Sequence, residues 1–145
     1  MKRTAKILLA SCMAAAMLVA LTACNKDSGS DDESKGVNIE GTWKKSVNTK
    51  EVTKESGVQF YKSYLEDNPV TWTVKSDGTL KMEVTSASTG TKTINATWSS
   101  EGNNISVVDL TASESKQRTS YIYDPDDGYI YFKDEAESVY RFEKK

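Results

Sequence analysis

The side chains able to do chemistry in this chain are few, and their types exclude most reaction classes. The 145 residues include no histidine, which removes the commonest general base and the commonest transition-metal ligand. Serine and threonine are abundant, but without histidine no Ser-His-Asp triad can activate them. The chain also has no glycine-rich phosphate-binding loop. We therefore predict no catalytic residue, no metal site and no cofactor, and we do not expect an enzyme.

Two runs of acidic residues are candidate cation sites. Asp124, Asp126 and Asp127 lie in an Asp-Pro-Asp-Asp-Gly sequence and carry the oxygen ligands that Ca²⁺ prefers. The run lacks the spacing and the distal glutamate of an EF-hand loop. A second run, residues 31–33, belongs to a long polar stretch. We interpret the first run as a hairpin turn and the second as part of a solvated tether.

The two cysteines, Cys12 and Cys24, lie near the N-terminus, so the rest of the chain has no disulfide. Basic residues precede an apolar run over residues 7–21. This run is too short for a membrane span, which needs roughly 20 apolar residues. A basic start followed by a short apolar run is typical of a secretory signal.

The expected signal ends in Leu21-Thr22-Ala23-Cys24, which resembles the bacterial lipobox. The resemblance implies cleavage between Ala23 and Cys24 and attachment of acyl chains such as palmitate to Cys24. Two or more acyl chains anchor a protein stably, at about 0.8 kcal/mol per buried methylene. We therefore expect residues 1–23 to be a lipoprotein signal peptide. The mature protein would be exported and anchored to a bacterial membrane through Cys24, at the cell surface or in the periplasm.

Residues 24–37 combine this cysteine with a polar linker. Residues 25–35 contain no apolar side chain, so we expect this stretch to be disordered. Three of the 19 basic residues precede residue 24, so the remaining chain carries 16 basic and 21 acidic residues, a net charge of −5. That balance argues against a nucleic-acid partner, because phosphate neutralisation needs a basic surface. Residues 38–145 remain for one folded domain.

Short alternating runs separated by turn residues fill most of this domain, a pattern typical of all-β proteins. Ser76-Asp77-Gly78 is expected to form a tight hairpin turn in which Gly78 adopts a positive φ. Consecutive hairpins of this kind predict an antiparallel meander of eight strands that closes into a barrel. The expected strands cover residues 41–47, 70–75, 80–85, 94–98, 105–110, 118–123, 129–132 and 139–142.

The exception to this pattern is the segment 48–69. Val58, Tyr61 and Leu65 recur at helical spacing, and Pro69 ends the element. We predict a short helix or insertion after the first strand. Residues 54–67 also alternate in places, so two short strands remain the alternative.

Three short segments, in this order, resemble the bacterial lipocalin-like proteins of the calycin group. They are Glu40-Gly41-Thr42-Trp43, Ser76-Asp77-Gly78-Thr79, and Ala96-Thr97-Trp98 followed by Gly102-Asn103-Asn104-Ile105. The resemblance covers residues 38–145 and implies a lipocalin-like barrel in which Trp43 packs at the closed end. It also implies an apolar ligand cavity. The segment 48–69 departs from the family pattern.

The first functional hypothesis is a binding module that captures a small apolar ligand. Its tentative ligand-binding residues are Trp43, Trp72, Trp98, Met82, Tyr61 and Tyr64. An eight-stranded barrel either holds one small ligand or is filled by its own side chains. The large size of the expected inward residues favours filling. This inward set is Trp43, Trp72, Val74, Leu80, Met82, Val84, Ile94, Ala96, Trp98, Ile105 and Val107.

The second hypothesis is a filled barrel that binds another envelope protein through outer tyrosines or acidic loops. Five tyrosines in the last three strands are candidates for one exposed aromatic ladder. They are Tyr121, Tyr123, Tyr129, Tyr131 and Tyr140. Tyrosine is also a strong strand former, so we favour cross-strand packing as their role.

Overall fold

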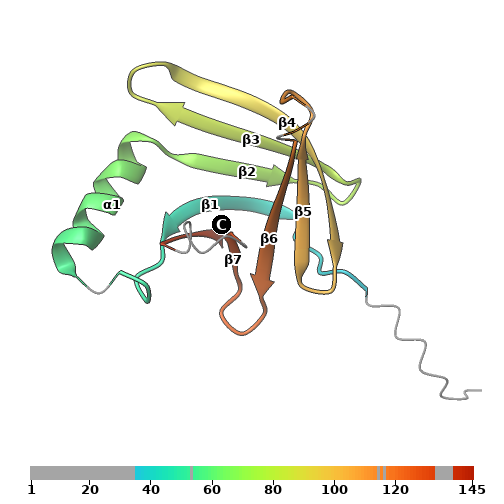
Figure 1. Ribbon diagram of the computed structural model, residues 1–145, viewed down its shortest axis with the longest axis horizontal. Helices are drawn as coiled ribbons and strands as arrows, with labels where there is room; N and C mark the ends of the chain where they lie inside the picture. The colour runs from blue at the N-terminus through green and yellow to red at the C-terminus, as the bar shows by residue number, and fades with distance from the viewer. Residues whose placement is uncertain (1–34, 53, 114, 116, 133–138) are drawn as a thin grey trace, which may run out of the picture. The chain divides into compact units, whose positions relative to one another are not determined.

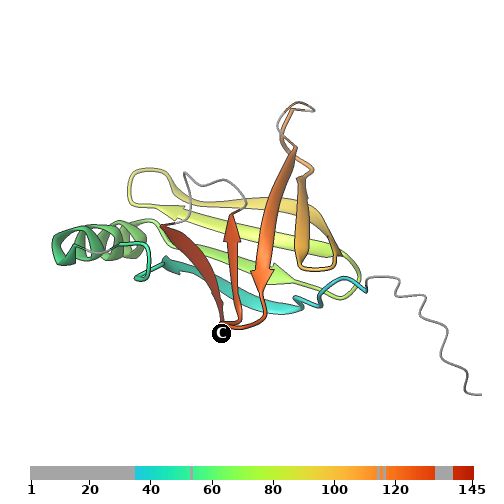
Figure 2. The same ribbon diagram turned by 60° about the horizontal axis from the view of Figure 1, so that its bottom comes forward.

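The fold is seen in a computed structural model of the chain (Figures 1 and 2). The expected signal peptide, Cys24 and the linker up to residue 34 lie outside the described residues. Across the described ranges, no helix combines the length and the hydrophobicity that a membrane crossing requires. The structure describes residues 35–52, 54–113, 115, 117–132 and 139–145.

Eight antiparallel strands form a closed barrel in which each strand pairs with its neighbours in the sequence, and the last strand pairs with the first. One helix follows the first strand. This is the architecture predicted from the alternating pattern. The elements are β1 (Gly41–Val47), α1 (Glu55–Asp67), β2 (Val70–Val74), β3 (Thr79–Ser86), β4 (Gly90–Glu101), β5 (Asn104–Asp109), β6 (Arg118–Asp124), β7 (Tyr129–Phe132) and β8 (Tyr140–Lys144).

The β2–β3 hairpin forms as its turn residues predict. Gly78 has φ 84°, a conformation that glycine adopts without steric cost. The Asp77 carboxylate accepts hydrogen bonds from the backbone N–H and the hydroxyl of Thr79, at 2.9 and 2.6 Å. Trp98 Nε1 donates to the Lys75 carbonyl at 2.9 Å. The turn is therefore tied to the neighbouring strand β4 as well as closed within itself.

Strand β4 is longer than the sequence predicts. The expected turn over residues 99–104 is wrong, because β4 and β5 stay paired until Glu101 and Asn104 face each other. Gly102, with φ 53°, and Asn103 alone make the turn. Serine and glutamate extend a strand here because cross-strand pairing sustains it when the side chains themselves have little preference.

The helical interpretation of residues 54–67 is confirmed, and the two-strand alternative is wrong. Val58, Tyr61 and Leu65 are half-buried on one face of α1. The backbone N–H and side-chain amide of Asn68 both donate to the Tyr64 carbonyl, at 2.9 and 3.0 Å. These bonds satisfy a carbonyl that the end of the helix would otherwise leave unpaired.

The barrel centre is occupied by aromatic rings. Trp72 is fully buried; its ring stacks on Phe142 at 4.0 Å between centroids and meets Tyr121 edge-on at 4.8 Å. Most of the predicted inward set is buried in one continuous cluster. Its buried members are Trp43, Trp72, Val74, Leu80, Ala96, Ile105 and Val107, with Met82 and Trp98 partly buried against it and with Val84 and Ile94 half-buried.

The described chain enters the barrel at the end opposite α1 (Figures 1 and 2). Val37 donates its backbone N–H to Gly102 in the β4–β5 turn at 3.0 Å, and Ile39 is fully buried in the core. Among the described residues, every member of the core lies between Val37 and Phe142, and residues 32–145 form one compact unit. The described core of the barrel therefore lies within this unit.

Candidate functional site

The tryptophans proposed to bind a ligand belong to the packed core. Trp43, Trp72 and Met82 pair across β1, β2 and β3 and share one level of the barrel. Trp43 Nε1 donates to the Ile39 carbonyl at 2.8 Å, and Trp98 lies near the β2–β3 turn. These side chains contact other core side chains, so their role is to pack the core of the barrel.

Tyr61 and Tyr64 lie apart from these tryptophans, on α1. The Tyr61 ring meets Tyr140 edge-on at 5.4 Å, and the Tyr64 ring lies 6.5 Å from Tyr140. Phe60 on the same helix is 66% exposed. The structure therefore does not bring the six predicted ligand-binding residues together at one site.

The hypothesis that five tyrosines of the last strands form one exposed ladder is wrong. Tyr121 is buried in the core and Tyr123 packs against it. Tyr131 pairs with Arg141 and, like Tyr129, lies on the opposite face of the sheet from Ile130, because successive strand residues alternate between faces. The tyrosines are therefore divided between the core and the outer surface.

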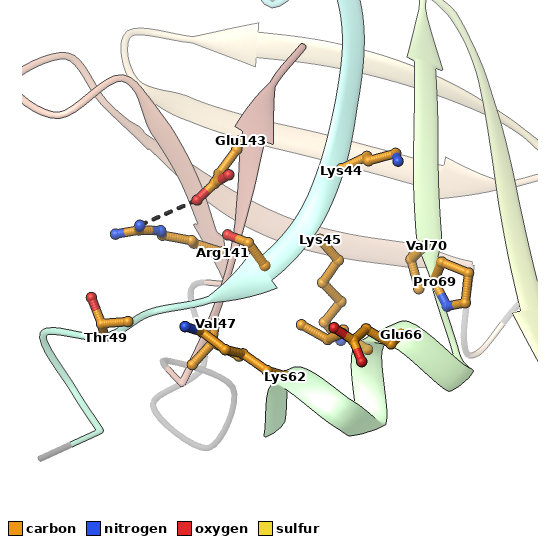
Figure 3. Close-up of a pocket in the computed structure, with 12 residues that line it drawn as sticks. Lys44, Lys45, Val47, Thr49, Lys62, Glu66, Pro69, Val70, Arg141 and Glu143 are labelled. Atoms are coloured by element: carbon orange, nitrogen blue, oxygen red, sulfur yellow. Dashed lines mark hydrogen bonds and ion pairs between the residues drawn. The ribbon is translucent and has the colours of Figure 1, made fainter. Parts of the chain in front are cut away.

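A cleft of about 590 Å³ lies at the rim of the barrel, between α1 and strands β1 and β8 (Figure 3). Its volume falls within the range of roughly 300–1,000 Å³ that is typical of small-molecule sites. The sequence did not point to this site. Its lining residues are Lys44, Lys45, Ser46, Val47, Thr49, Lys62, Leu65, Glu66, Pro69, Val70, Arg141 and Glu143.

Strands β1 and β8 form one wall of the cleft, and helix α1 forms the other. Lys44 and Ser46 are two residues apart on β1 and share a face of the strand. Across the sheet they pair with Glu143 and Arg141 of β8. The opposite wall is α1, where Lys62, Leu65 and Glu66 are spaced three and four residues apart and therefore lie on one helical face.

The cleft carries an excess of positive charge. Four basic side chains line it against two acidic ones. Arg141 donates to the Glu143 carboxylate at 3.2 Å, and these two charges offset each other. Lys44 and Lys62 are exposed, and within the described part of the chain the structure gives neither of them an ion-pair partner.

Apolar side chains complete the lining. Val47 is almost fully buried, and Leu65 and Val70 are half-buried. Pro69 lies between the helix and β2 and adds its ring to the same wall (Figure 3). The cleft is therefore amphipathic, with charged groups beside an apolar lining.

Two buried polar atoms beside the cleft have no hydrogen-bond partner. They are Ser46 Oγ and Arg141 Nε. The Arg141 side chain is only 11% exposed, and its guanidinium carbon lies 3.7 Å from the centroid of the Tyr129 ring. An unpaired buried polar group costs roughly 1–3 kcal/mol. Both groups therefore reduce the stability of this edge of the barrel.

A polar network covers the outer surface next to Arg141. Tyr131 donates its hydroxyl to Asp127 at 2.5 Å, and Lys50 pairs with the same carboxylate at 3.3 Å. Burial would raise the pKa of Asp127, but the hydrogen bonds from Tyr131, the Tyr129 backbone and Lys50 outweigh it and lower the pKa. Burial and the bond to Asp127 raise the pKa of Tyr131 to about 12. This network ties the segment after β1 to the β6–β7 turn.

The acidic run at residues 124–128 forms the predicted turn. Asp124 accepts a hydrogen bond from the backbone N–H of Asp126 at 3.0 Å, and its carbonyl accepts one from Gly128 at 2.8 Å. In the part of the chain that the structure describes, no three acidic, cysteine or histidine side chains are grouped to hold a metal ion.

Comparisons of the chain with protein-family models, with curated proteins and with solved structures found no match. The functional proposal below therefore depends on the residues and the geometry of this chain.

Proposed function

We propose that this protein is an exported, lipid-anchored, non-enzymatic binding module. The barrel serves as a rigid scaffold, and the cleft between α1 and β1 receives a small ligand with an apolar part. The observation that carries this proposal is the amphipathic cleft of about 590 Å³ beside a core filled by aromatic rings. Because aromatic side chains fill the core, we place the ligand site at the rim and not in the barrel interior.

The anchor is proposed from the lipobox resemblance at Leu21-Thr22-Ala23-Cys24. The described chain enters the barrel near Gly102, at the end opposite α1. A tether attached at that end leaves the cleft at the other end open to ligand. Anchoring and ligand capture are therefore compatible in one small domain.

The anchor is tested by expressing the full chain in bacteria with an alkyne analogue of palmitate and separating membranes from soluble protein. We expect the wild-type chain and the matched control Cys12→Ser to carry the label and sediment with membranes. Cys24→Ser should remain unlabelled. Label on the Cys24→Ser protein would reject Cys24 as the anchoring residue.

The ligand site is tested by native mass spectrometry of residues 32–145 purified from bacteria without detergent. We expect an additional mass that disappears on denaturation. Leu65→Trp fills the cleft and should remove this mass, whereas the control Ile122→Trp, at a position that is 38% exposed and does not line the cleft, should retain it. Loss of the mass in Val107→Trp but not in Leu65→Trp would place the ligand inside the barrel instead.

A second candidate function is binding of an envelope protein through α1. The observation that favours it is the exposure of Phe60 and Tyr64 on one helix, since aromatic residues are enriched in protein interfaces. A photo-crosslinking amino acid at Phe60, introduced into the full chain in living cells, should form one defined adduct. An adduct of equal yield from the same crosslinker at Leu110 would show non-specific contact and reject this function.

A further inference from the structure

We infer that the free edge of β4 over Gly90–Ile94 is a docking site for an extended segment of another protein. The segment adds to the sheet as a strand and carries an acidic side chain opposite Lys92. This edge lies in the β3–β4 hairpin and shares no residue with the cleft between α1 and β1. The docking site is therefore separate from the proposed ligand site, and each can exist without the other.

Strand β4 is paired on both sides over only part of its length. It pairs with β3 over Gly90–Thr97, but with β5 only over Ala96–Glu101. A hydrogen bond from the Leu110 N–H to the Asn95 carbonyl, at 3.1 Å, continues the second pairing by one residue. The chain then leaves β4 and turns toward β6. Among the residues that the structure describes, Gly90–Ile94 therefore has a strand on one side and none on the other.

The backbone groups of Thr91 and Thr93 point out of this edge. In an antiparallel sheet, successive residues bond alternately to the strand on one side and to the strand on the other. The Asn95 carbonyl bonds the β5 side, whereas the Trp98 N–H bonds the Gly78 carbonyl on the β3 side. Residues two and four positions before Asn95 therefore direct their N–H and C=O groups toward the side that β5 has left. Two donors and two acceptors are thus available to an added strand.

This edge can accept a strand because little in the structure blocks it. Thr91, Lys92 and Thr93 are all exposed, and threonine favours the extended conformation. Proteins often protect an edge with a proline or a bulge, but residues 90–94 contain no proline and their register with β3 is continuous. In Figures 1 and 2 the β3–β4 hairpin extends past β5 toward the end of the molecule that carries α1.

The charge of Lys92 determines which strand can add here. A second copy of this edge would pair fully in one register, with Thr91 opposite Thr93 and Lys92 opposite Lys92. Like charges directly opposite each other destabilise an antiparallel pair. The Lys92 backbone bonds β3, so its side chain would take a non-hydrogen-bonded position, where the side chains of two strands lie closest. An acidic residue opposite Lys92 replaces this repulsion by attraction, which favours a segment of a different protein.

The ammonium group of Lys92 is available for such a partner. Across the described ranges it has no ion pair. The acid of the neighbouring strand, Asp109, instead accepts the backbone N–H and the hydroxyl of Thr111, at 2.7 Å each. Ile94 lies two residues from Lys92 on the same face of β4 and is half-buried. An antiparallel partner therefore carries an apolar residue opposite Ile94 and, two residues later, the acid opposite Lys92.

The experiment measures amide hydrogen exchange by NMR in residues 32–145, the compact unit that contains the barrel. In the free protein, the amides of Thr91 and Thr93 should exchange much faster than those of Lys92 and Ile94, which bond β3. The probe is the acetylated and amidated peptide Val-Thr-Glu-Thr-Ser, whose valine and glutamate face Ile94 and Lys92. At several times its dissociation constant, it should shift the Thr91 and Thr93 signals and slow their exchange by about fivefold.

Charge reversal tests the chemistry of the partner. A peptide with lysine in place of the glutamate should bind at least about threefold more weakly, and Lys92→Glu should invert this order. The matched control Lys75→Glu changes the net charge equally at an exposed position outside this edge and should keep the original order. Proline in place of the second threonine of the probe removes the N–H that bonds the Thr91 carbonyl, and it should abolish the slowing of exchange.

Four results would overturn the docking site or its partner. Equal affinity of the acidic and basic peptides would exclude an acidic partner. Slow exchange of Thr91 and Thr93 in the free protein at every concentration would mean that the edge is already paired within the chain. Slow exchange that appears only at high protein concentration would mean that a second copy occupies the edge. If no peptide shifts the Thr91 and Thr93 signals, strand addition at β4 is excluded.

Discussion

Trp72 of β2 and Phe142 of β8 stack across the barrel centre, with ring centroids 4.0 Å apart and an interplanar angle of 28°. Strand β1 lies between these two strands in the sheet, so the contact spans the interior. Tyr121 of β6 closes against both rings edge-on. The barrel is therefore held together by aromatic contacts between strands that do not pair with one another.

Trp72→Ala should lower the free energy of unfolding by about 3–5 kcal/mol, the usual cost of removing a large buried side chain. The reason is the cavity left between Phe142 and Tyr121, which neighbouring strands cannot fill. Urea unfolding followed by circular dichroism measures the change. The control Phe60→Ala, at an exposed position, should stay within about 0.5 kcal/mol of the wild type. A loss of that small size for Trp72→Ala would contradict a tightly packed centre.

Trp43→Phe should be more destabilising than Trp72→Phe, by about 1 kcal/mol. Both changes replace a buried indole with the smaller phenyl ring. Trp43 also loses the hydrogen bond that its Nε1 donates to the Ile39 carbonyl, whereas Trp72 Nε1 is buried without a partner and its removal relieves that penalty. Urea unfolding of the two variants in parallel gives the comparison. Equal losses would show that the Trp43 bond has no net value.

At alkaline pH, the free energy of unfolding should depend on the ionisation of Tyr131. Its pKa in the folded protein, about 12, exceeds the ordinary value of 10 for tyrosine. The neutral phenol therefore stabilises the fold fully below pH 10, and this contribution is lost as the pH rises toward 12. Between these pH values, the melting temperature of the wild type should fall more steeply than that of Tyr131→Phe.

At acid pH, Tyr131→Phe should change the stability of the protein through its effect on the pKa of Asp127. The folded-state pKa of Asp127 is lowered, so its contribution is present above the unfolded value of 3.8 and is lost as the pH falls through the folded value. Without the Tyr131 hydroxyl this pKa rises toward its ordinary value, and the acid-side loss becomes smaller. Identical acid and alkaline profiles for wild type and Tyr131→Phe would contradict the role assigned to this hydrogen bond.

Tyr61→Ala should release α1 while leaving the barrel folded. The helix has no fully buried residue, and Tyr61 provides an edge-on contact with Tyr140, a type of pair worth about 0.5–1.5 kcal/mol beyond its buried area. Amide hydrogen exchange over Glu55–Asp67 should accelerate by roughly tenfold, with β2–β6 unchanged. The control Gln59→Ala, an exposed helix position, should leave exchange as it is. Simultaneous acceleration in the barrel strands would show that α1 and the barrel unfold as one unit.

The positions of the strands and of most turns follow from short-range patterns in the sequence. Alternation with a period of two residues is a property of each segment alone, and it correctly predicted eight strands and part of their core. The expected inward set did not include the buried residues Ile39, Tyr121, Ile130 and Phe142. Gly78 marked its hairpin because few other residues adopt a positive φ. The same local reasoning misjudged the end of β4, since polar residues extend a strand only when a partner strand such as β5 pairs with them.

The cleft could not be predicted from any single segment of the sequence. Lys44 and Ser46 lie on β1, and Lys62 lies on α1. No periodicity within either segment states which face of the helix meets which face of the strand. That choice depends on how Tyr61 and Leu65 pack against the barrel, and thus on contacts between residues far apart in the chain. The cleft is a property of this docking, so its lysines read as ordinary surface charges until the helix is in place.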